Sequence, residues 1–513
     1  MNVTSSVHLL DDDTAALDRA RSLWRAGNYT ETLSVLETAA PRAERFLLAA
    51  RASYALRRYD DALSHLAAGH VLFGGADQVE SDALSAVLHE IKGNVRESDV
   101  FYERAAALAV KHPSGRASNM LALRAWMRDD LAETQRRLRV GEACADASVR
   151  AQALNVRSWV HASRREFVQQ AKVLKDVLDV LDVLDVLEGS PCPDTGRAAE
   201  VLQTLSGRCR EMYLPEEFAT VCAAAHAVRW TSDLEGQECK TLRHIALANA
   251  MQGQYVVGLR QLQHVTSLAR TPSDAALALL DAAWIALASG ERNAAEAFLR
   301  DALDAIERID WKHQVGAQIG VLLLAAEIGC TFDPQIARRL LATYDAAKGE
   351  TPALAGVRHD RSFDPVEAYT RALVLAVAGQ VGPARKFAKK AYREFAQMGY
   401  DWRAARCALF LYESGCGDTW LAAAKDRARN YPRSFIGAQL QRIEYESSFE
   451  PLARLTPRQR DVVRLLAQGD TVVDVAAALK TSPGTVRVHL KHIHRALGVR
   501  NRVELLRAVR RSA

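Results

Sequence analysis

Apolar residues recur at three- and four-residue spacing through most of residues 10 to 447, and the two-residue alternation of half-buried strands is nearly absent. This pattern predicts amphipathic helices that bury one side each. One predicted buried stripe consists of Ala294, Ala297, Phe298, Ala302, Leu303 and Ile306. We therefore expect an all-α fold.

A short turn of the approximate form Gly-x-Tyr-x-x-Ala separates many of these helical segments. Its instances begin at Gly27, Arg57, Gly93, Asp129, Ser163, Gly253, Gly290 and Gly379. The first five begin 30, 36, 36 and 34 residues apart, the next pair 37, and the final gap of 89 residues has room for two longer units. The turn and its spacing resemble the tetratricopeptide repeat, whose period is about 34 residues. The resemblance implies about ten helical hairpins, stacked as an α-solenoid in which each hairpin covers its neighbour's apolar face.

Two irregular segments interrupt this predicted array. Residues 176–187 are four copies of Asp-Val-Leu, and a step of three residues rotates a helix by about 300°, so no clean polar face results. The repeat is either an expansion that lengthens one helix or an apolar surface that contacts another protomer. The breaker-rich residues 188–193 follow, and residues 348–364 could form a loop that lines a site.

These interruptions predict three domains. They are a helical repeat array at 1–188, a second array at 195–447 and a small C-terminal domain at 452–513. A short link at Ser447 to Leu452 would join the second array to the C-terminal domain.

Composition narrows the class of protein. The chain has no run of about 18 apolar residues and no signal-peptide pattern at its N-terminus, which predicts a soluble, cytoplasmic protein. Its eight cysteines include no Cys-x-x-Cys pair, so we expect reduced thiols and no metal site. The chain also has no phosphate-binding Gly-Lys motif and no hydrolase or dinucleotide motif. We expect no cofactor, no catalytic residues and no enzyme activity.

The C-terminal segment has explicit helix signals. Thr456-Pro457-Arg458-Gln459 predicts a capped helix start, and Gly469 a helix end. A short helix is expected over Thr471 to Leu479, and Thr481 or Ser482 would cap a third helix, with Pro483 in its first turn. Val486, Leu490, Ile493 and Leu497 would be its buried side. Asn501 to Glu504 would open a fourth helix.

Charge sets this segment apart. Residues 451–513 contain 13 Lys and Arg against 4 Asp and Glu, a net charge of +9, whereas residues 1–450 carry −4. The stretch from Thr481 to Arg500 contains no acidic residue. A basic module on a mildly acidic body is suited to a phosphate backbone.

Leu455 to Ala508 resembles the LuxR-type helix-turn-helix domain of bacterial transcription regulators. Matching elements are Leu455-Thr456-Pro457-Arg458, Val475-Ala476 to Leu479, Ser482, Gly484-Thr485-Val486, His489, Leu497-Gly498-Val499 and Asn501-Arg502. The resemblance implies that Arg487, Val488 and Lys491 face the major groove and that Thr485 and His489 lie near the DNA backbone. The full set of expected DNA-binding residues is Thr481, Ser482, Thr485, Arg487, Val488, His489, Lys491, His492, Arg495, Arg500 and Arg502.

The last expected helix, Arg502 to Arg511, has Val503, Leu506 and Val509 at three-residue spacing. These side chains either pack into their own domain or, as the resemblance implies, pair two copies on DNA. The expected partners are double-stranded DNA, a second copy of the chain and a protein, peptide or small-molecule effector at the repeats. The resulting hypothesis is a DNA-binding transcription regulator whose helical repeats sense a signal. The alternative is a protein-interaction scaffold with a vestigial or docking-only DNA-binding domain.

Overall fold

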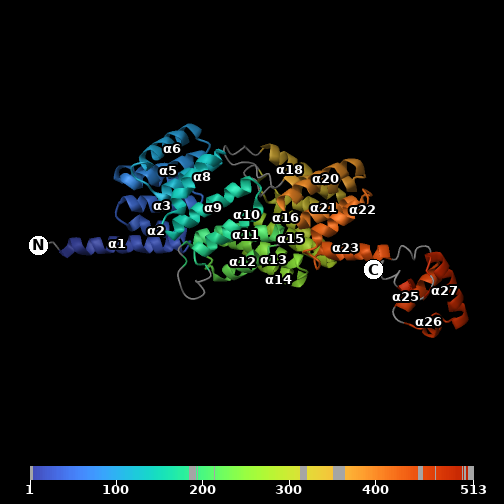
Figure 1. The fold of residues 1–513 in the computed structure, drawn as a ribbon. Coiled ribbons are helices and arrows are strands. Elements are labelled where there is room, and N and C mark those ends of the chain that lie inside the picture. Colours follow the sequence, from blue (N-terminus) through green and yellow to red (C-terminus); the bar gives the residue numbers. More distant parts are fainter. Residues whose placement is uncertain are drawn as a thin grey trace. The chain divides into compact units, whose positions relative to one another are not determined.

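The computed structural model describes residues 4–183, 192, 194–212, 214–311, 320–350, 364–448, 455–467, 470–499, 501 and 504–506. Every regular element in these ranges is a helix, so the expected all-α fold is confirmed. The chain forms two compact units, Met1–Asn430 and Tyr431–Ala513. The larger unit contains the repeats (Figure 1), and the smaller one contains α23 (Phe435–Ser448) and the basic C-terminal segment.

Helices of the larger unit pair in sequence as antiparallel hairpins, eleven of them in the described residues. The pairs are α1 (Thr4–Arg25) with α2 (Tyr29–Thr38), α3 (Ala43–Ala55) with α4 (Tyr59–Gly69), α5 (Gly75–Ile91) with α6 (Val95–Ala109), α7 (Gly115–Met127) with α8 (Leu131–Glu142), α9 (Ala147–Ser163) with α10 (Phe167–Val180), α11 (Thr195–Glu211) with α12 (Pro215–Ala227), α13 (Glu235–Met251) with α14 (Tyr255–Leu268), α15 (Pro272–Ser289) with α16 (Arg292–Glu307), α17 (Gly320–Phe332) with α18 (Pro334–Glu350), α19 (Asp364–Val377) with α20 (Val381–Met398), and α21 (Asp401–Glu413) with α22 (Asp418–Ala428). A 3₁₀ turn, η1 (His70–Leu72), follows α4.

The turns inside these hairpins share a backbone conformation. Each turn predicted from the sequence contains a residue with positive φ, and at Gly290 the value is 87°. Arg57, Asp129 and Arg165 adopt the same left-handed conformation, at φ of 61°, 66° and 60°. The fifth turn was therefore placed wrongly, because its left-handed residue is Arg165 rather than Ser163. The 89-residue gap does contain two longer units, divided by the turn after α17.

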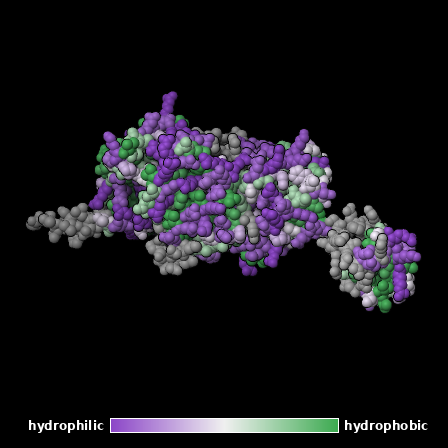
Figure 2. All heavy atoms as spheres, in the orientation of Figure 1, coloured by the Kyte–Doolittle hydropathy of each residue, from purple (hydrophilic) through white to green (hydrophobic). Residues whose placement is uncertain are grey.

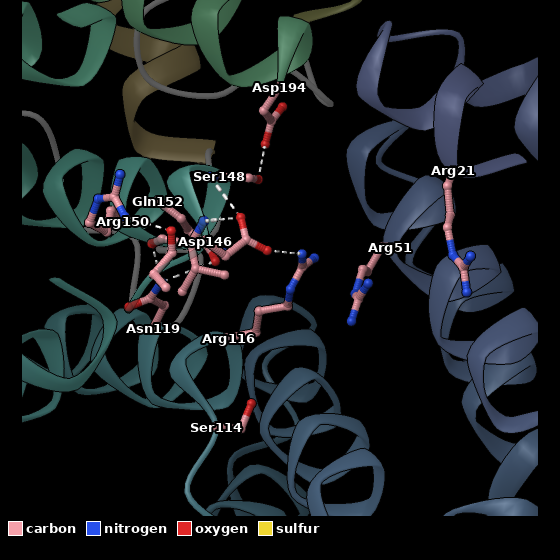
Figure 3. A network of polar contacts seen from close by, with 12 residues as sticks. Arg21, Arg51, Ser114, Arg116, Asn119, Asp146, Ser148, Arg150, Gln152 and Asp194 are labelled. Carbon is pink, nitrogen blue, oxygen red and sulfur yellow. Dashed lines mark hydrogen bonds and ion pairs between the residues drawn. The ribbon is translucent and has the colours of Figure 1, made fainter. Parts of the chain in front are cut away.

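Polar contacts at the starts of α7, α9 and α11 tie neighbouring hairpins together (Figure 3). Asp146 caps α9 by accepting a hydrogen bond from the Ser148 amide at 2.9 Å, and it also accepts one from Nη2 of Arg116 in α7 at 2.9 Å. The Ser148 hydroxyl donates to Asp194, the cap of α11, at 2.8 Å. Capping and inter-repeat contacts thus share the same carboxylates.

The hairpins wind tightly enough for distant ones to meet. The Thr30 amide and hydroxyl of the first hairpin both donate to Asp233, at 2.8 Å, beside the start of α13. Further along, Arg403 of α21 donates to Glu211 of α11 at 2.5 Å. The first hairpin therefore contacts the region between the sixth and seventh, and the sixth contacts the eleventh.

The irregular segments are described in part. The helix over the Asp-Val-Leu copies ends at Val180, so the predicted lengthening does not extend through the repeat. Val177, Leu178, Leu181 and Val183 pack in one hydrophobic core with Leu202 and Leu205 of α11, while Asp176, Asp179 and Asp182 are exposed. In the described copies, the apolar residues thus cover the chain's own core rather than a second protomer.

That shared core also spans the expected boundary between two repeat arrays, 1–188 and 195–447, and the larger unit continues to Asn430. The three-domain division stays a prediction. Helix α23 includes Ser447 and Ser448, the first two residues of the expected link. Residues 449–452 of that link and 351–363 of the irregular stretch lie outside the described residues. None of the described helices has the length and apolar character needed to cross a membrane.

Candidate nucleic-acid interface

Three capped helices build the C-terminal domain: α25 (Pro457–Ala467), α26 (Val472–Ala478) and α27 (Pro483–Leu497). The Thr456 amide donates to Oε1 of Gln459 at 2.9 Å, which makes the predicted start of α25. Thr471 and Asp474 form a reciprocal capping box at α26, and Ser482 accepts from the Thr485 amide at 3.1 Å to cap α27. These caps confirm the expected helix starts and identify Ser482, rather than Thr481, as the cap of α27.

One side of α27 packs into the hydrophobic core of this domain. Val486 and Ile493 are fully buried, and Leu490 and Leu497 pack against the same cluster. Their partners include Val462, Val463 and Leu466 of α25 with Val475 and Ala476 of α26. The predicted buried side is confirmed, so the opposite side of α27 faces outward.

A tight turn connects α26 to α27. Lys480 takes a left-handed conformation there, at φ of 51°. The Thr481 amide donates to the Ala476 carbonyl at 2.9 Å, and the Arg458 guanidinium donates to the Leu479 carbonyl. Arg458 thereby links α25 to the turn, a role that sequence reasoning missed because the two residues are 21 positions apart.

The outward side of α27 presents most of the predicted DNA-binding residues. Those exposed are Ser482, Thr485, Arg487, Val488, Lys491, His492 and Arg495, while Thr481 and His489 are half-buried. Among the described residues, Arg487, Lys491 and Arg495 have no ion-pair partner, so their charges are available to a ligand. In Figure 2 the C-terminal unit shows hydrophilic residues along one edge, beside a strip of hydrophobic residues. Arg500 and Arg502 lie outside the described residues.

The segment after α27 is described only in part. Gly498 ends α27 in a left-handed conformation, at φ of 66°. The Glu504 amide donates to Asn501 at 2.8 Å, which is the predicted helix-start contact. Leu505, at 0% exposure, fills the domain core, and Leu506 is half-buried. Val503 and Val509, the other two expected dimerisation residues, lie outside the described residues, so the pairing surface stays a prediction.

Comparison with known proteins places this geometry in a family. Residues 453–509 match the model described as "Bacterial regulatory proteins, luxR family". The transcriptional regulatory protein UhpA of Escherichia coli is 51% identical over 53 residues, covering 10% of this chain and 27% of UhpA. The nitrate/nitrite response regulator protein NarL of Escherichia coli is 41% identical over 51 residues, covering 10% of this chain and 24% of NarL.

Similarity to mycobacterial proteins extends beyond the C-terminal domain. Mb0914c of Mycobacterium bovis, provisionally assigned as an HTH-type transcriptional regulator, is 28% identical over 237 residues, covering 44% of this chain and 25% of Mb0914c. The aligned parts thus span about a quarter of these relatives' lengths.

Two solved structures align with the repeats at low similarity. The P58(IPK) TPR domain has a TM-score of 0.23 at 12% identity, covering 79% of this chain and 99% of its own. The APC/C hetero-tetramer Cut9-Hcn1 has a TM-score of 0.27 at 12% identity, covering 94% and 99%. The assignment of the repeat fold therefore relies on the helical hairpins of this chain and not on these two structures. With its capped three-helix core and the match over residues 453–509, the chain carries a C-terminal helix-turn-helix domain of the luxR family of bacterial regulatory proteins.

Proposed function

We propose that this protein is a bacterial transcription regulator that reads operator DNA with α27 and receives a signal through its helical repeats. The observation that carries the proposal is the outward side of α27 within a luxR-family domain. That side is basic, exposed and free of acidic residues, whereas the opposite side is committed to the core.

The chemistry of DNA recognition fits the order of residues along α27. A helix of this kind enters the major groove with its N-terminal half against the base edges. Arg487 can donate two hydrogen bonds to a guanine, and Val488, 56% exposed, can contact a thymine methyl group. Ser482 and Thr485 stand at the helix N-terminus, where backbone amides and the helix dipole attract a phosphate.

The repeats are assigned the receiving role because they make up most of the chain. Stacked helical hairpins present an extended inner surface that is suited to peptides, protein segments or small molecules. A signal can control DNA binding only if it binds the DNA-competent and incompetent states with different affinity. We further propose that two copies bind together, each reading one half-site.

Selection of genomic DNA fragments by the purified full-length protein, followed by sequencing, tests this function. The expected result is an enriched motif with two inverted half-sites, centred about one helical turn, or roughly 10 base pairs, apart. If no motif is enriched above random fragments, and binding is as weak as for duplexes of arbitrary sequence, the operator-reading role is wrong. The scaffold alternative would then gain support.

A further inference from the structure

A cavity of about 400 Å³ lies on the inner helices of the sixth to the eleventh hairpins. Its walls come from α11, α13, α15, α17, α19 and α21, all in the second half of the repeat unit. The tight winding brings its walls together, because Arg403 of α21 contacts Glu211 of α11 and so joins the two ends of this helical turn. Its volume lies in the range of small-molecule sites, about 300–1,000 Å³.

Helices α13, α15, α17 and α21 each contribute both charged and apolar side chains to the cavity. Helix α13 contributes Lys240, Arg243, His244 and Leu247. Helix α15 faces it with Leu277, Asp281 and Trp284 among others, and Trp284 meets Trp402 of α21 at a ring-centroid distance of 5.7 Å. The cavity therefore offers an apolar body a place beside charged groups.

Positive charge exceeds negative charge in this lining. Six Lys and Arg residues face four Asp and Glu residues, and three of these acids, Glu211, Asp281 and Glu327, already form ion pairs. Glu211 accepts from Arg403 at 2.5 Å and also pairs with Arg210, while Glu327 lies 2.5 Å from Arg406. Lys240, in contrast, has no ion-pair partner among the described residues.

Four buried polar atoms of lining residues have no hydrogen-bond partner in the described structure: Nε of Arg210 and Arg243, Oδ2 of Asp281 and Oε1 of Glu327. The two carboxylates each have an arginine within ion-pair distance. Arg243 is 9% exposed, and its Nε lies 3.3 Å from Asp281 without forming a hydrogen bond. Because a buried N–H without an acceptor costs about 1–3 kcal/mol, the two Nε donors favour a ligand with oxygen acceptors.

Burial disfavours the charged form of Lys240, Arg243 and His244 and lowers the pKa of each. Burial lowers the pKa of Lys240, and so do the nearby Arg57 and Arg243, whereas Asp274 opposes the change. Burial, with Arg210 and Arg243, holds the pKa of His244 well below its usual value, so that the imidazole is neutral. The excess positive charge therefore comes from the lysine and the arginines.

We propose that this cavity binds a small organic anion, a carboxylate or a phosphate ester with an apolar body. The anionic group meets Lys240, Arg210 and Arg243, and the apolar body packs against Leu247, Leu277 and Trp284. The inference rests on the proposed function only in treating this anion as the signal. Binding itself is a property of the repeat unit.

The test measures binding of phenylacetate and phenyl phosphate to the full-length protein by ligand-observed NMR, with phenylacetamide as the uncharged counterpart. Either or both anions should bind at least about tenfold more tightly than the amide, a difference of about 1.4 kcal/mol. The preference between the two anions then identifies the carboxylate or the phosphate as the natural chemistry. Equal binding of amide and anions, or no binding of either anion, overturns the proposal.

Lys240→Gln is the decisive variant because it removes a cation without leaving a carboxylate unpaired. It should weaken anion binding at least about tenfold while the melting temperature stays within error. Lys389→Gln, on the exposed side of α20, is the matched control and should bind like wild type. Wild-type affinity in Lys240→Gln overturns the proposal.

The double variant Arg243→Gln/Asp281→Asn provides a second check, since it removes both members of the buried pair together. It should weaken anion binding by a similar factor, and wild-type affinity would contradict the site. Titration of the same preparations with the selected DNA separates the two proposals. If the wild-type protein binds the selected DNA but neither anion, only this inference is overturned, whereas anion binding without operator recognition overturns only the proposed function.

Discussion

Arg487 and Lys491 stand four positions apart on α27, so both point outward from one side of the helix. Arg487→Ala should cost about 1–3 kcal/mol at the selected operator and relax the preference at one base pair. Lys491→Ala should act similarly or reduce the slope of log affinity against log salt by about one. Fluorescence anisotropy titrations at several salt concentrations measure both effects.

Asp461, on the supporting helix α25, gives the control for this pair. Among the described residues it forms a surface ion pair with Arg464 at 3.5 Å and no other ion pair, so Asp461→Ala should bind DNA with the same salt slope as wild type. If Arg487→Ala and Lys491→Ala both bind the operator like wild type, α27 is not the reading helix.

Glu211 joins the sixth and eleventh hairpins through buried charges. Burial opposes its ionisation, but Arg210 and Arg403 outweigh burial and lower its pKa to about 2. Glu211→Gln leaves these cations without their carboxylate and should destabilise the fold by about 3–5 kcal/mol in urea denaturation. Glu296→Gln, which breaks an exposed pair with Arg300, should change stability by less than about 1 kcal/mol.

The lowered pKa of Glu211 also determines how the stability of the fold changes with pH. A glutamate in the unfolded chain has a pKa of about 4.3, so the stabilisation that ionised Glu211 provides is fully present above that pH. It is lost as the pH falls toward about 2, the pKa of Glu211 in the folded protein. Wild type should therefore lose stability more steeply than Glu211→Gln across this window, and parallel pH profiles would contradict the assignment.

Sequence patterns predicted single residues well where one helix side is strongly apolar. The buried side of α27 is such a case, whereas the stripe predicted on α16 was partly wrong. There the structure buries Ala295, Leu299, Ala302, Ala305 and Ile306 and exposes Ala297. Alanines on several sides of α16 leave the choice of buried side to its neighbours in space. The charged cavity was not predicted, because its pairs join residues as distant as Glu211 and Arg403.

At the level of elements, substitutions at the left-handed turn residues test backbone strain separately from side-chain packing. Gly290 has φ of 87°, and a Cβ added there would meet nothing within 4 Å. Gly290→Ala should therefore destabilise the fold by about 1–2 kcal/mol through the backbone alone. Arg57 is exposed at φ of 61°, so Arg57→Gly should be neutral or stabilising.

Gly382 in α20 is the matched control for Gly290. It also has open space around it, but it lies in a helix rather than at positive φ. Gly382→Ala should therefore stabilise the fold, by up to about 1 kcal/mol, through helix propensity. Thermal denaturation of the variants measures these differences, and a stabilising Gly290→Ala would show that the turn can relax.

The turns were predictable because glycine marks most of the left-handed positions. The fifth was displaced by two residues because neither Ser163 nor Arg165 is a glycine, so composition gave no local marker. The end of α10 at Val180 was missed for a related reason: the Asp-Val-Leu copies have no breaker before residue 188. In both cases tertiary packing decided what the local sequence left open.

For the whole molecule, the repeat period predicted stacking but not winding. Spacing along the chain cannot tell how much each hairpin rotates relative to the last. Thr30 meets Asp233 across 203 positions, and Tyr29 packs in one core with Ala199 and Leu234. The cavity follows from this winding, which is why the sequence predicted an effector at the repeats without indicating this cavity.

The repeat unit should strengthen DNA binding by the C-terminal domain. The C-terminal domain has its own core, around Val463, Val486 and Leu505, so the fragment 448–513 should fold alone. Its contact with one half-site is small, whereas joining two copies raises affinity through effective concentration. We therefore expect the fragment to bind the operator more weakly than the full-length protein, by a factor of about 10²–10⁴ if the repeats hold two copies together. Anisotropy titrations of both proteins, with their masses on DNA, measure this. Equal affinity and one full-length copy per operator would show that the repeats neither pair nor gate the DNA-binding domain.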